Sequence, residues 1–398
     1  MNLAILSYEY PPDTGYGGIG TYSYYHARAL VKLGHRVHVI AGATSDGIHR
    51  SEHDGVQVTR IKRSGWLPRF LQTAKDRRCG WFANRLETGK AAHEALTHLV
   101  NREQIDLVEM PECGGDGAVV ATLSAVPTVV KFHSPARLIM GIYDTPKIDR
   151  ELTAFVEQVA INQATIRTSC SQYLADEVME KMNVSPPVHV IPNGIDVPLF
   201  DRDEGIDVHD RFGIPRDGVT IFFANRMEER KGIHLVQEMA PQILAKHKDA
   251  HFVLAGGDAF GYMRDRILPF IKAQRLQKRF HYLGPLDLPS VRAVCKSIDI
   301  FIIPSLWENC PYSCIEAMTA GRAIVSSDCG GMPELIQHGQ NGLLARSGDA
   351  TSFVAALDEL VEDRGLRERL GSAARATVED RLTDLAVAEQ ALEVYRSA

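Results

Sequence analysis

The sequence predicts an α/β protein built from two doubly wound domains of similar size, and three observations support this. The chain of 398 residues exceeds the size at which a single hydrophobic core usually keeps growing. Short apolar runs alternate with helical patterns along both halves, as a parallel sheet with crossover helices requires. Between the halves, prolines and the Asn193-Gly194 turn interrupt this periodicity, so we expect the linker near residues 191–200.

The first half opens with a βαβ unit. An apolar strand at 3–6 is followed by a glycine-rich loop, a helix with apolar residues at helical spacing, and a second strand at 37–40. Gly34 ends the helix, because glycine is favoured just beyond a helix C-terminus. Further strands at 105–108 and 126–132 extend the parallel sheet.

The second half repeats this alternation. Apolar runs of strand length occur at 220–224, 251–255, 280–283, 300–303 and 323–326. From residue 349 the pattern is helical almost to the end. We place the first domain at 1–195 and the second at 196–379, and we expect the C-terminal helix at 380–398 to pack back on the first domain.

The composition excludes several classes of protein. Lys and Arg total 44 against 50 Asp and Glu, so the net charge of −6 provides no global basic field for nucleic acid. The seven cysteines show no CxxC spacing, which argues against a zinc site and a disulfide framework. Cys310 and Cys314 are interpreted as small buried hydrophobes. We expect a cytoplasmic protein, because neither a signal peptide nor a membrane span is evident.

A glycine-rich loop at 15–20 separates the first strand from its helix. Glycines let backbone amides approach a phosphate at a helix N-terminus, where the helix dipole favours negative charge. The spacing differs from the GxGxxG fingerprint of dinucleotide-binding folds, and an ordinary turn would also account for it. Gly17 and Gly18 are the candidate phosphate contacts.

A charged cluster at 225–232 follows the strand at 220–224. Arg226 and Lys231 are placed to meet one anion, the guanidinium as a fork and the ammonium as a point charge. Solvated surface charge is the alternative. Ligands of doubly wound sheets bind beyond the carboxyl ends of the strands, so the position of this cluster favours a phosphate contact.

The most informative cluster, 304–317, follows the strand at 300–303. Glu308 and Glu316 are separated by seven residues, which places the first on a strand-end loop and the second in the body of the next helix. The two carboxylates can therefore serve different parts of one ligand. Pro311 suits the first helical turn, where its missing N–H is not needed. A second glycine-rich loop, 330–334, follows the next strand.

Taken together, these motifs resemble those of the retaining family 4 glycosyltransferases, and the resemblance covers nearly the whole chain. The spacing of Glu308 and Glu316 is similar to the family signature. The segments 192–196, 226–232 and 330–334 match further stretches in the family's order, as do Gly17-Gly18 and 34–37. The resemblance implies a GT-B fold, in which two Rossmann-like domains face each other across a cleft that holds a nucleoside-diphosphate sugar. It also implies no essential metal and transfer with retained anomeric configuration.

The resemblance further implies roles for single residues. Gly18 would meet the diphosphate through its amide, and Arg226 and Lys231 would neutralise it. Glu316 would hold the ribose hydroxyls and Glu308 the hydroxyls of the donor sugar. His133 resembles the family's histidine at the donor sugar, although a lone histidine is more often structural. The candidate set is His133, Glu308, Arg226 and Lys231 for catalysis, and Gly17, Gly18, Asn225, Arg226, Lys231, Gly256, Leu283, Glu308, Pro311, Tyr312, Ser313 and Glu316 for donor binding.

Two departures from the family pattern affect the donor contacts. Asn225 stands where many members have glycine. Cys310-Pro311 stands where many have Phe-Gly, which removes one backbone donor, so the diphosphate would rely on the amides of Tyr312 and Ser313. Fixed cations and amide dipoles aimed at the leaving phosphate would replace a metal. We favour front-face displacement, because no second carboxylate nucleophile is evident. No cofactor is expected, and UDP is favoured over GDP.

A basic segment at 60–90 contains nine basic residues against two acidic ones, interleaved with aromatic and aliphatic side chains. This composition suits an anionic acceptor or peripheral contact with the inner membrane face, and an ordinary helix with a solvated basic face is the alternative. The basic residues are Arg60, Lys62, Arg63, Arg69, Lys75, Arg77, Arg78, Arg85 and Lys90.

Three other functions share part of this pattern. A nucleotide-sugar epimerase has the same GT-B architecture, a NAD-dependent oxidoreductase has Rossmann halves, and a non-catalytic binder of nucleotide sugars is conceivable. The missing GxGxxG motif weakens the oxidoreductase. The Arg226/Lys231 and Glu308/Glu316 pairs favour a transferase, whose acceptor would be a small molecule, a glycan or a lipid-linked molecule.

Overall fold

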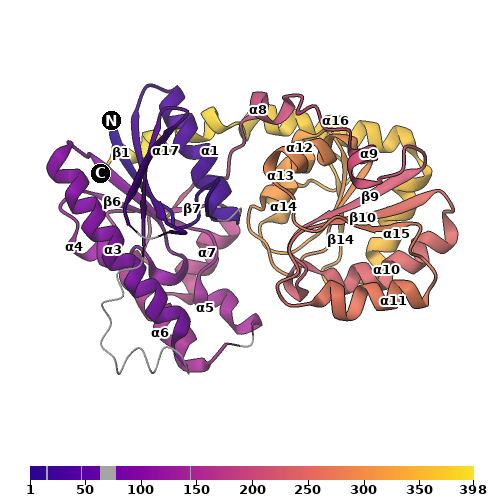
Figure 1. Cartoon of the computed structure of the whole chain (residues 1–398), viewed down its shortest axis with the longest axis horizontal. Helices are drawn as coiled ribbons and strands as arrows, with labels where there is room; N and C mark the ends of the chain where they lie inside the picture. The colour runs from indigo at the N-terminus through magenta and orange to yellow at the C-terminus, as the bar shows by residue number, and fades with distance from the viewer. Residues whose placement is uncertain (15–16, 46, 63–77, 144) are drawn as a thin grey trace. The chain divides into compact units, whose positions relative to one another are not determined.

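The structure is a computed structural model that describes residues 1–14, 17–45, 47–62, 78–143 and 145–398. The chain forms two compact units (Figure 1). Residues Met1–Gly194 and Asp384–Ala398 form the first unit, and Ile195–Thr383 form the second. The chain therefore passes from one unit to the other twice, after Gly194 and again after Thr383.

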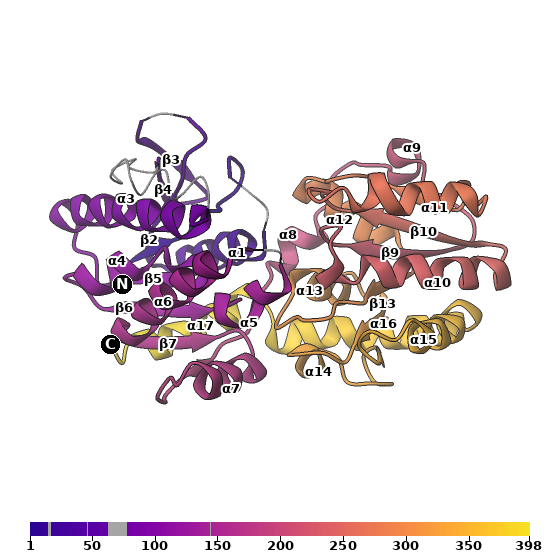
Figure 2. The same ribbon diagram turned by 90° about the horizontal axis from the view of Figure 1, so that it is seen from below.

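The first unit contains a sheet with the strand order β3-β4-β2-β1-β5-β6-β7-β8. All neighbouring strands are parallel except the β3–β4 pair, which Figure 2 shows at the edge of the sheet. The strands are β1 (Asn2–Leu6), β2 (Arg36–Gly42), β3 (His49–His53), β4 (Val56–Ile61), β5 (Leu107–Pro111), β6 (Thr128–Phe132), β7 (Ile166–Ser169) and β8 (His189–Val190).

The helices of this unit form two groups. The α1 helix packs against α17, the last helix of the chain, whereas α3, α4 and α6 pack against one another. The helical segments are α1 (Gly18–Lys32), α3 (Gly80–Arg102), η1 (Cys113–Gly115), α4 (Ala118–Leu123), α5 (Ala136–Ile139), η2 (Met140–Ile142), α6 (Lys147–Gln163), α7 (Gln172–Lys181) and α17 (Asp384–Tyr395).

The second unit contains a parallel sheet with the order β11-β10-β9-β12-β13-β14. Its strands are β9 (Val219–Ala224), β10 (Ala250–Ala255), β11 (Phe280–Tyr282), β12 (Ile300–Ile303), β13 (Ala323–Ser327) and β14 (Leu343–Ala345). Its helical segments are α8 (Val197–Asp201), α9 (Val208–Phe212), η3 (Glu229–Lys231), α10 (Ile233–Lys246), η4 (Met263–Ile267), α11 (Leu268–Ala273), α12 (Leu288–Ser297), α13 (Tyr312–Thr319), α14 (Met332–Leu335), α15 (Ala350–Glu362) and α16 (Arg364–Arg381).

Both sheets reverse their strand order at one point, as Rossmann folds do. The reversal lies between β1 and β5 in the first sheet and between β9 and β12 in the second. A crevice forms beyond the carboxyl ends of the strands at such a point, because the flanking crossover helices lie on opposite faces of the sheet. The two predicted doubly wound sheets are confirmed, and each contains one switch point.

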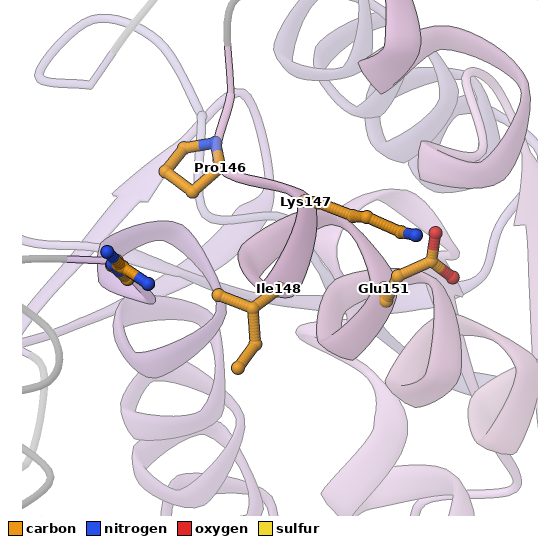
Figure 3. Close-up of a pocket in the computed structure, with 5 residues that line it drawn as sticks. Pro146, Lys147, Ile148 and Glu151 are labelled. Atoms are coloured by element: carbon orange, nitrogen blue, oxygen red, sulfur yellow. The ribbon is translucent and has the colours of Figure 1, made fainter.

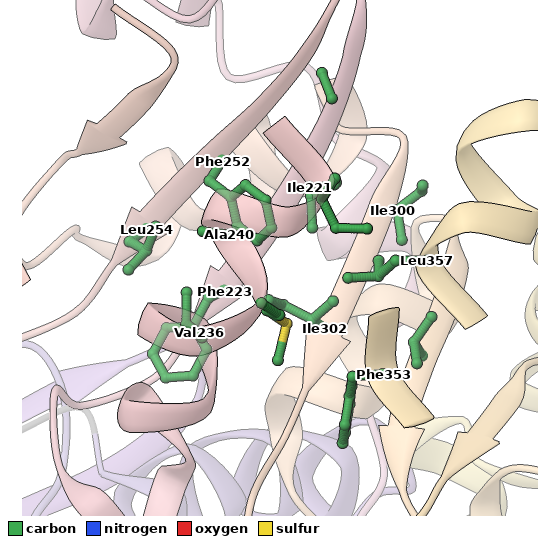
Figure 4. Packing of buried hydrophobic residues seen from close by; sticks show 14 of the residues in the cluster. Ile221, Phe223, Val236, Ala240, Phe252, Leu254, Ile300, Ile302, Phe353 and Leu357 are labelled. Carbon is green, nitrogen blue, oxygen red and sulfur yellow. The ribbon is translucent and has the colours of Figure 1, made fainter. Parts of the chain in front are cut away.

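The core of the second unit follows from the alternation of side chains along its strands. Ile221 and Phe223 of β9, Phe252 and Leu254 of β10, and Ile300 and Ile302 of β12 point to the same face, where they meet α10 and α15 (Figure 4). Side chains two residues apart share a face of a strand, so each strand contributes its pair to this layer. Phe222 and Phe301 point to the other face, with ring centroids 5.2 Å apart.

One predicted strand is shifted along the chain. The strand predicted at 105–108 runs from Leu107 to Pro111. The Asp106 carboxylate accepts the backbone amide of Asn2 at 2.7 Å, just before the two strands pair. Within the described residues, every helix is too short or too polar to cross a bilayer.

Candidate functional site

The loops that follow β9 and β12 come together at the switch point of the second sheet. Gly232, at the end of the β9 loop, has a φ of 80°, and a Cβ there would lie 1.9 Å from the carbonyl oxygen of Pro304. A side chain is therefore excluded both by the backbone conformation and by the neighbouring loop. In addition, the Leu306 amide donates to the Arg230 carbonyl at 2.8 Å. These contacts place the charged cluster at 225–232 beside Glu308.

Lys231 and Glu308 form a buried ion pair between these two loops. The Lys231 side chain is 12% exposed and that of Glu308 is 8% exposed. The same carboxylate oxygen accepts the Ser305 hydroxyl at 3.1 Å. Burial opposes ionisation of Glu308, but the adjacent Lys231 ammonium and Arg230 guanidinium outweigh it and lower the pKa of this carboxyl. Glu308 is therefore ionised at neutral pH.

Two arginines contact a second buried carboxylate, that of Glu228. Arg226 approaches Glu228 Oε1 at 3.2 Å and remains 60% exposed, whereas Arg230 reaches the same oxygen at 3.1 Å and is buried. Arg230 also donates to the Trp307 carbonyl at 3.2 Å. Sequence reasoning assigned no role to Arg230 or Glu228. Their position between two predicted cations was the available signal, but nothing in the sequence shows which of three neighbouring basic residues turns inward.

The glycine-rich loop at 330–334 closes against Glu308 from the end of β13. Gly330 has a φ of 56°, and a Cβ there would lie 1.9 Å from the Glu308 carbonyl oxygen. That oxygen accepts the Gly331 amide at 3.0 Å. The backbone of Glu308 is thus held by the loop of the following strand, while its side chain is held by Lys231 and Ser305.

Glu316 lies in the body of α13, on the second turn of the helix, as the seven-residue spacing predicts. Burial raises the pKa of Glu316, and the positive charge of Arg292 on α12 offsets part of this rise. The resulting pKa is about 7. Arg292 itself is paired with Glu204, with an N–O distance of 2.5 Å. Glu316 therefore accepts a proton more readily than an exposed glutamate does.

The start of α13 carries the other candidates from this cluster. Pro311 adopts extended backbone and immediately precedes the helix, so the prediction that it lies in the first turn is wrong by one residue. Its carbonyl accepts the amides of Cys314 and Ile315. Ser313, in the first turn, has its hydroxyl 3.5 Å from the side-chain amide of Asn225 at the end of β9.

Gly256 and Leu283 lie at the ends of β10 and β11. A Cβ at Gly256, whose φ is 143°, would lie 1.9 Å from the Asn225 carbonyl oxygen, so this glycine permits the close approach of the β9 loop. The Leu283 amide donates to the Leu254 carbonyl at 2.8 Å, which continues the β10–β11 ladder. The structure therefore places Gly256 against Asn225 and Leu283 one strand further from the switch point.

In the first unit, α1 begins directly after the glycine-rich loop, with Gly17 at its N-cap position. A Cβ at Gly17 would lie 2.1 Å from the Glu9 carboxylate, whereas a Cβ at Gly18 would meet no atom of the described residues within 4 Å. The first turn of α1 contains no acidic residue. The Gly18 position is thus open, and the helix dipole there favours an anion.

His133 follows β6, and its backbone and ring are held separately. Its amide donates to both oxygens of the Glu112 carboxylate, at 2.8 and 2.9 Å. Its ring packs on Tyr22 of α1 with a centroid distance of 5.2 Å. Burial, aided by the positive charge of Lys131, lowers the pKa of His133 well below its ordinary value. The imidazole is therefore neutral.

The loop that follows β6 is held by another buried carboxylate besides that of Glu112. Glu157 of α6 accepts the amides of Gly114 and Ala136, each at 2.6 Å. Burial, together with the nearby carboxylate of Glu112, raises the pKa of Glu157 well above its ordinary value. Burial also raises the pKa of Glu112 to about 7. Neither glutamate was singled out by the sequence, because a carboxylate that binds backbone amides leaves no motif.

Part of the basic segment at 60–90 lies outside the described residues, including Arg63, Arg69, Lys75 and Arg77. The structure contradicts a surface role for Arg60, which is buried and donates to the carbonyls of Tyr10 and Pro11. Arg85 pairs with Asp116 at 2.8 Å. A depression of about 670 Å³ lies beside Arg78 and the start of α6, where Pro146, Lys147, Ile148 and Glu151 line it (Figure 3). None of the candidate donor contacts lines it.

Comparison with known proteins connects this geometry to a family. Residues 207–377 match the family model for glycosyl transferases group 1, and residues 16–198 match that for glycosyltransferase family 4. An uncharacterised glycosyltransferase of Methanocaldococcus jannaschii is 27% identical over 413 aligned residues, which cover the whole of this chain and 98% of that protein.

Two solved structures show the same fold over the whole chain. The sucrose-phosphate synthase of Thermosynechococcus elongatus superposes with a TM-score of 0.81 at 19% identity and is covered to 98%. Anabaena HepE in complex with UDP-glucose superposes with a TM-score of 0.72 at 19% identity and is covered completely.

Proposed function

Because the chain belongs to the family 4 glycosyltransferases, which have the GT-B fold, we propose that it transfers a sugar from a nucleoside-diphosphate sugar to an acceptor hydroxyl with retention of anomeric configuration. The family assignment favours a transferase over the epimerase and the NAD-dependent oxidoreductase. We also propose that transfer needs no metal ion.

The observation that supports this proposal most strongly is the charge arrangement beyond β9 and β12. Arg226, Arg230 and Lys231 lie there within ion-pair distance of the carboxylates of Glu228 and Glu308. These three cations stand beyond the switch point, where a diphosphate would bring negative charge. Arg226, the exposed member, would turn to the diphosphate, and Lys231 would stabilise the charge that develops as it departs.

The remaining candidates take complementary roles in this proposal. Glu316 would accept the ribose hydroxyls, and Glu308, fixed by Lys231, would orient the donor sugar. From the first unit, Gly18 would donate its amide to the diphosphate, and the neutral imidazole of His133 would contact the sugar. The leaving phosphate would take the proton of the acceptor as the front-face displacement proceeds.

We propose UDP as the nucleotide. Support comes from Anabaena HepE, which shares the fold and was solved with UDP-glucose. Thermal shifts with UDP, GDP and ADP at the same concentration test this choice, because a ligand at 100 times its dissociation constant stabilises a protein by about 2.7 kcal/mol. A larger shift with GDP or ADP than with UDP would contradict it.

For the acceptor, we propose an anionic or membrane-linked molecule that meets the first unit near Arg78 and Trp81, both of which are exposed. Arg78→Glu should then weaken binding to anionic vesicles and leave binding to neutral vesicles unchanged. Equal binding of the wild type to both kinds of vesicle would contradict the electrostatic contact.

The experiment that tests the proposed function is product analysis. The protein is incubated with radiolabelled UDP-glucose and a panel of acceptors, and the new linkage is read by NMR. An α-linked product and released UDP are expected from an α-linked donor. A β-linked product would overturn retention, and an epimerised free donor without transfer would overturn the transferase.

A further inference from the structure

A buried network in the first unit surrounds Tyr22, in the second turn of α1. Its hydroxyl donates to Glu109 Oε1 at 2.9 Å. Three groups pack against its ring. The ring centroids of His133 and of the stacked His26 lie 5.2 Å and 5.1 Å from the Tyr22 centroid, and the Lys131 ammonium lies 4.6 Å from it. The Tyr22 side chain is therefore fixed at its tip and at its faces.

The groups around Tyr22 are fixed in turn. Lys131 donates to the Ile191 carbonyl at 2.7 Å. The second oxygen of Glu109 accepts the hydroxyl of Tyr395, from the last helix of the chain, and His26 lies 3.1 Å from the same hydroxyl. All of these side chains are buried. A buried carboxylate bound by two phenols has little freedom to move, because breaking either bond takes a hydrogen-bond donor away from a buried oxygen.

We propose that Tyr22 is a positioning residue that holds the His133 ring, and that Glu109 anchors Tyr22 through its hydroxyl. The backbone of His133 is fixed by Glu112, and the Tyr22 ring packs against the imidazole and restricts its rotation. Because Tyr22 and Gly18 belong to the same helix, the network also keeps the two proposed donor contacts of this unit in register.

This inference rests on the proposed role of His133 at the donor sugar. A small displacement of a reacting group lowers turnover by as much as about a hundredfold. We therefore expect Tyr22→Leu, which removes the ring, to lower kcat about a hundredfold, with less than a twofold change in donor KM. Tyr22→Phe, which keeps the ring and loses the anchor, should lower kcat about tenfold.

Tyr395→Phe is the matched control. It removes the other phenol that donates to Glu109, and Tyr395 is as buried as Tyr22. Tyr395 lies on α17, however, and is linked to His133 indirectly, through Glu109 or His26 and then Tyr22. The substitution should lower the melting temperature as much as Tyr22→Phe does and change kcat less than threefold. Equal losses of kcat in Tyr22→Phe and Tyr395→Phe would overturn the inference, since both would then report a general loss of structure.

A double-mutant cycle tests whether Tyr22 acts through His133. In a His133→Ala background, Tyr22→Leu should lower kcat less than twofold further, because there is no ring left to position. An undiminished loss in that background would overturn the inference.

A second readout does not depend on activity. In protein labelled with ¹⁵N-histidine, the ring signals of His133, identified by their loss in His133→Ala, should shift in both Tyr22 variants and stay unchanged in Tyr395→Phe. Unchanged His133 signals in Tyr22→Leu would overturn the positioning role. If the wild type transfers no sugar, the proposed function fails, and these spectra still decide whether Tyr22 holds His133.

Discussion

Lys231 and Glu308 form an ion pair that joins the loops after two neighbouring strands, β9 and β12, at the switch point of the second sheet. Seventy-seven residues separate them in the chain. The pair explains why a lysine assigned to phosphate and a glutamate assigned to the sugar occur together: each fixes the other before a donor arrives. Replacing either residue alone should therefore change both turnover and the free energy of unfolding, so the two quantities have to be measured separately.

Lys231→Met should lower turnover about a hundredfold, the scale of losing one charge contact to the transition state. It should also lower the free energy of unfolding by about 3 kcal/mol, because Glu308 is left as a buried, unpaired charge. Urea unfolding and steady-state kinetics measure the two effects. In the double variant Lys231→Met/Glu308→Gln, stability should largely return while turnover stays low. Recovery of turnover in the double variant would contradict a role for Lys231 in catalysis.

Arg226→Ala should change turnover with little effect on stability, since this side chain is 60% exposed. We expect turnover to fall about a hundredfold, with a change in unfolding free energy within about 0.5 kcal/mol. Arg364→Ala is the matched control and should leave turnover unchanged, because Arg364 lies on the exposed start of α16 and its ion pair among the described residues is with Glu368 of the same helix. Near-normal turnover in Arg226→Ala would remove this residue from the site.

Nucleotide binding should depend on pH through Glu316, whose pKa lies at about 7 in the free protein. Ribose hydroxyls donate to the ionised carboxylate, so binding favours the deprotonated form. Affinity for UDP should therefore rise with pH between 6 and 8 and level off above the pKa, and binding at pH 6 should release a proton. Calorimetry in buffers of different ionisation enthalpy measures that proton. Glu316→Gln is the control, and proton release of the same size in this variant would assign it to another group.

The two glutamates should also differ in kinetics. Glu316→Ala should mainly weaken donor binding, because the ribose contact is present in ground and transition states alike. Glu308→Gln should lower turnover with a smaller change in donor affinity. If calorimetry shows the nucleotide lost in Glu308→Gln and retained in Glu316→Ala, the two roles are reversed.

Gly330→Ala should destabilise the protein and distort the site together. The residue has a φ of 56°, and the added Cβ would lie 1.9 Å from the Glu308 carbonyl oxygen, so the loop has to move. We expect a loss of more than 1 kcal/mol in unfolding free energy, since both backbone strain and a steric clash contribute. Gly339→Ala, at a φ of 75° with open space around the position, is the control that carries only the strain. Equal losses in the two variants would show that the contact with Glu308 adds nothing.

Transfer should survive exhaustive chelation, because Arg226, Arg230 and Lys231 already provide positive charge where the diphosphate would bind. Initial rates with and without EDTA, after dialysis against the chelator, measure this. A requirement for magnesium or manganese would contradict the charge compensation proposed for these side chains.

The sequence by itself determined the two doubly wound sheets and most of their strands, because the alternation of apolar runs and helical patterns is a local property. It also placed Arg226, Lys231 and Glu308 on strand-end loops and Glu316 in the helix that follows one of them. Gly232 and Gly330 each lie in a glycine-containing motif that is visible in the sequence. The reason for each glycine, a carbonyl oxygen that would lie 1.9 Å from a Cβ, is a property of the tertiary structure.

The tertiary structure alone decided which of these residues meet. The inward turn of Arg230 to Glu228, the exposure of Arg226 and the pairing of Lys231 with Glu308 depend on loops from different strands packing together. The same holds for Tyr22, Glu109 and Tyr395, which come from the first helix, the fifth strand and the last helix. Such contacts leave no periodicity in the sequence, because they join residues up to 286 positions apart and are set by the packing of whole elements.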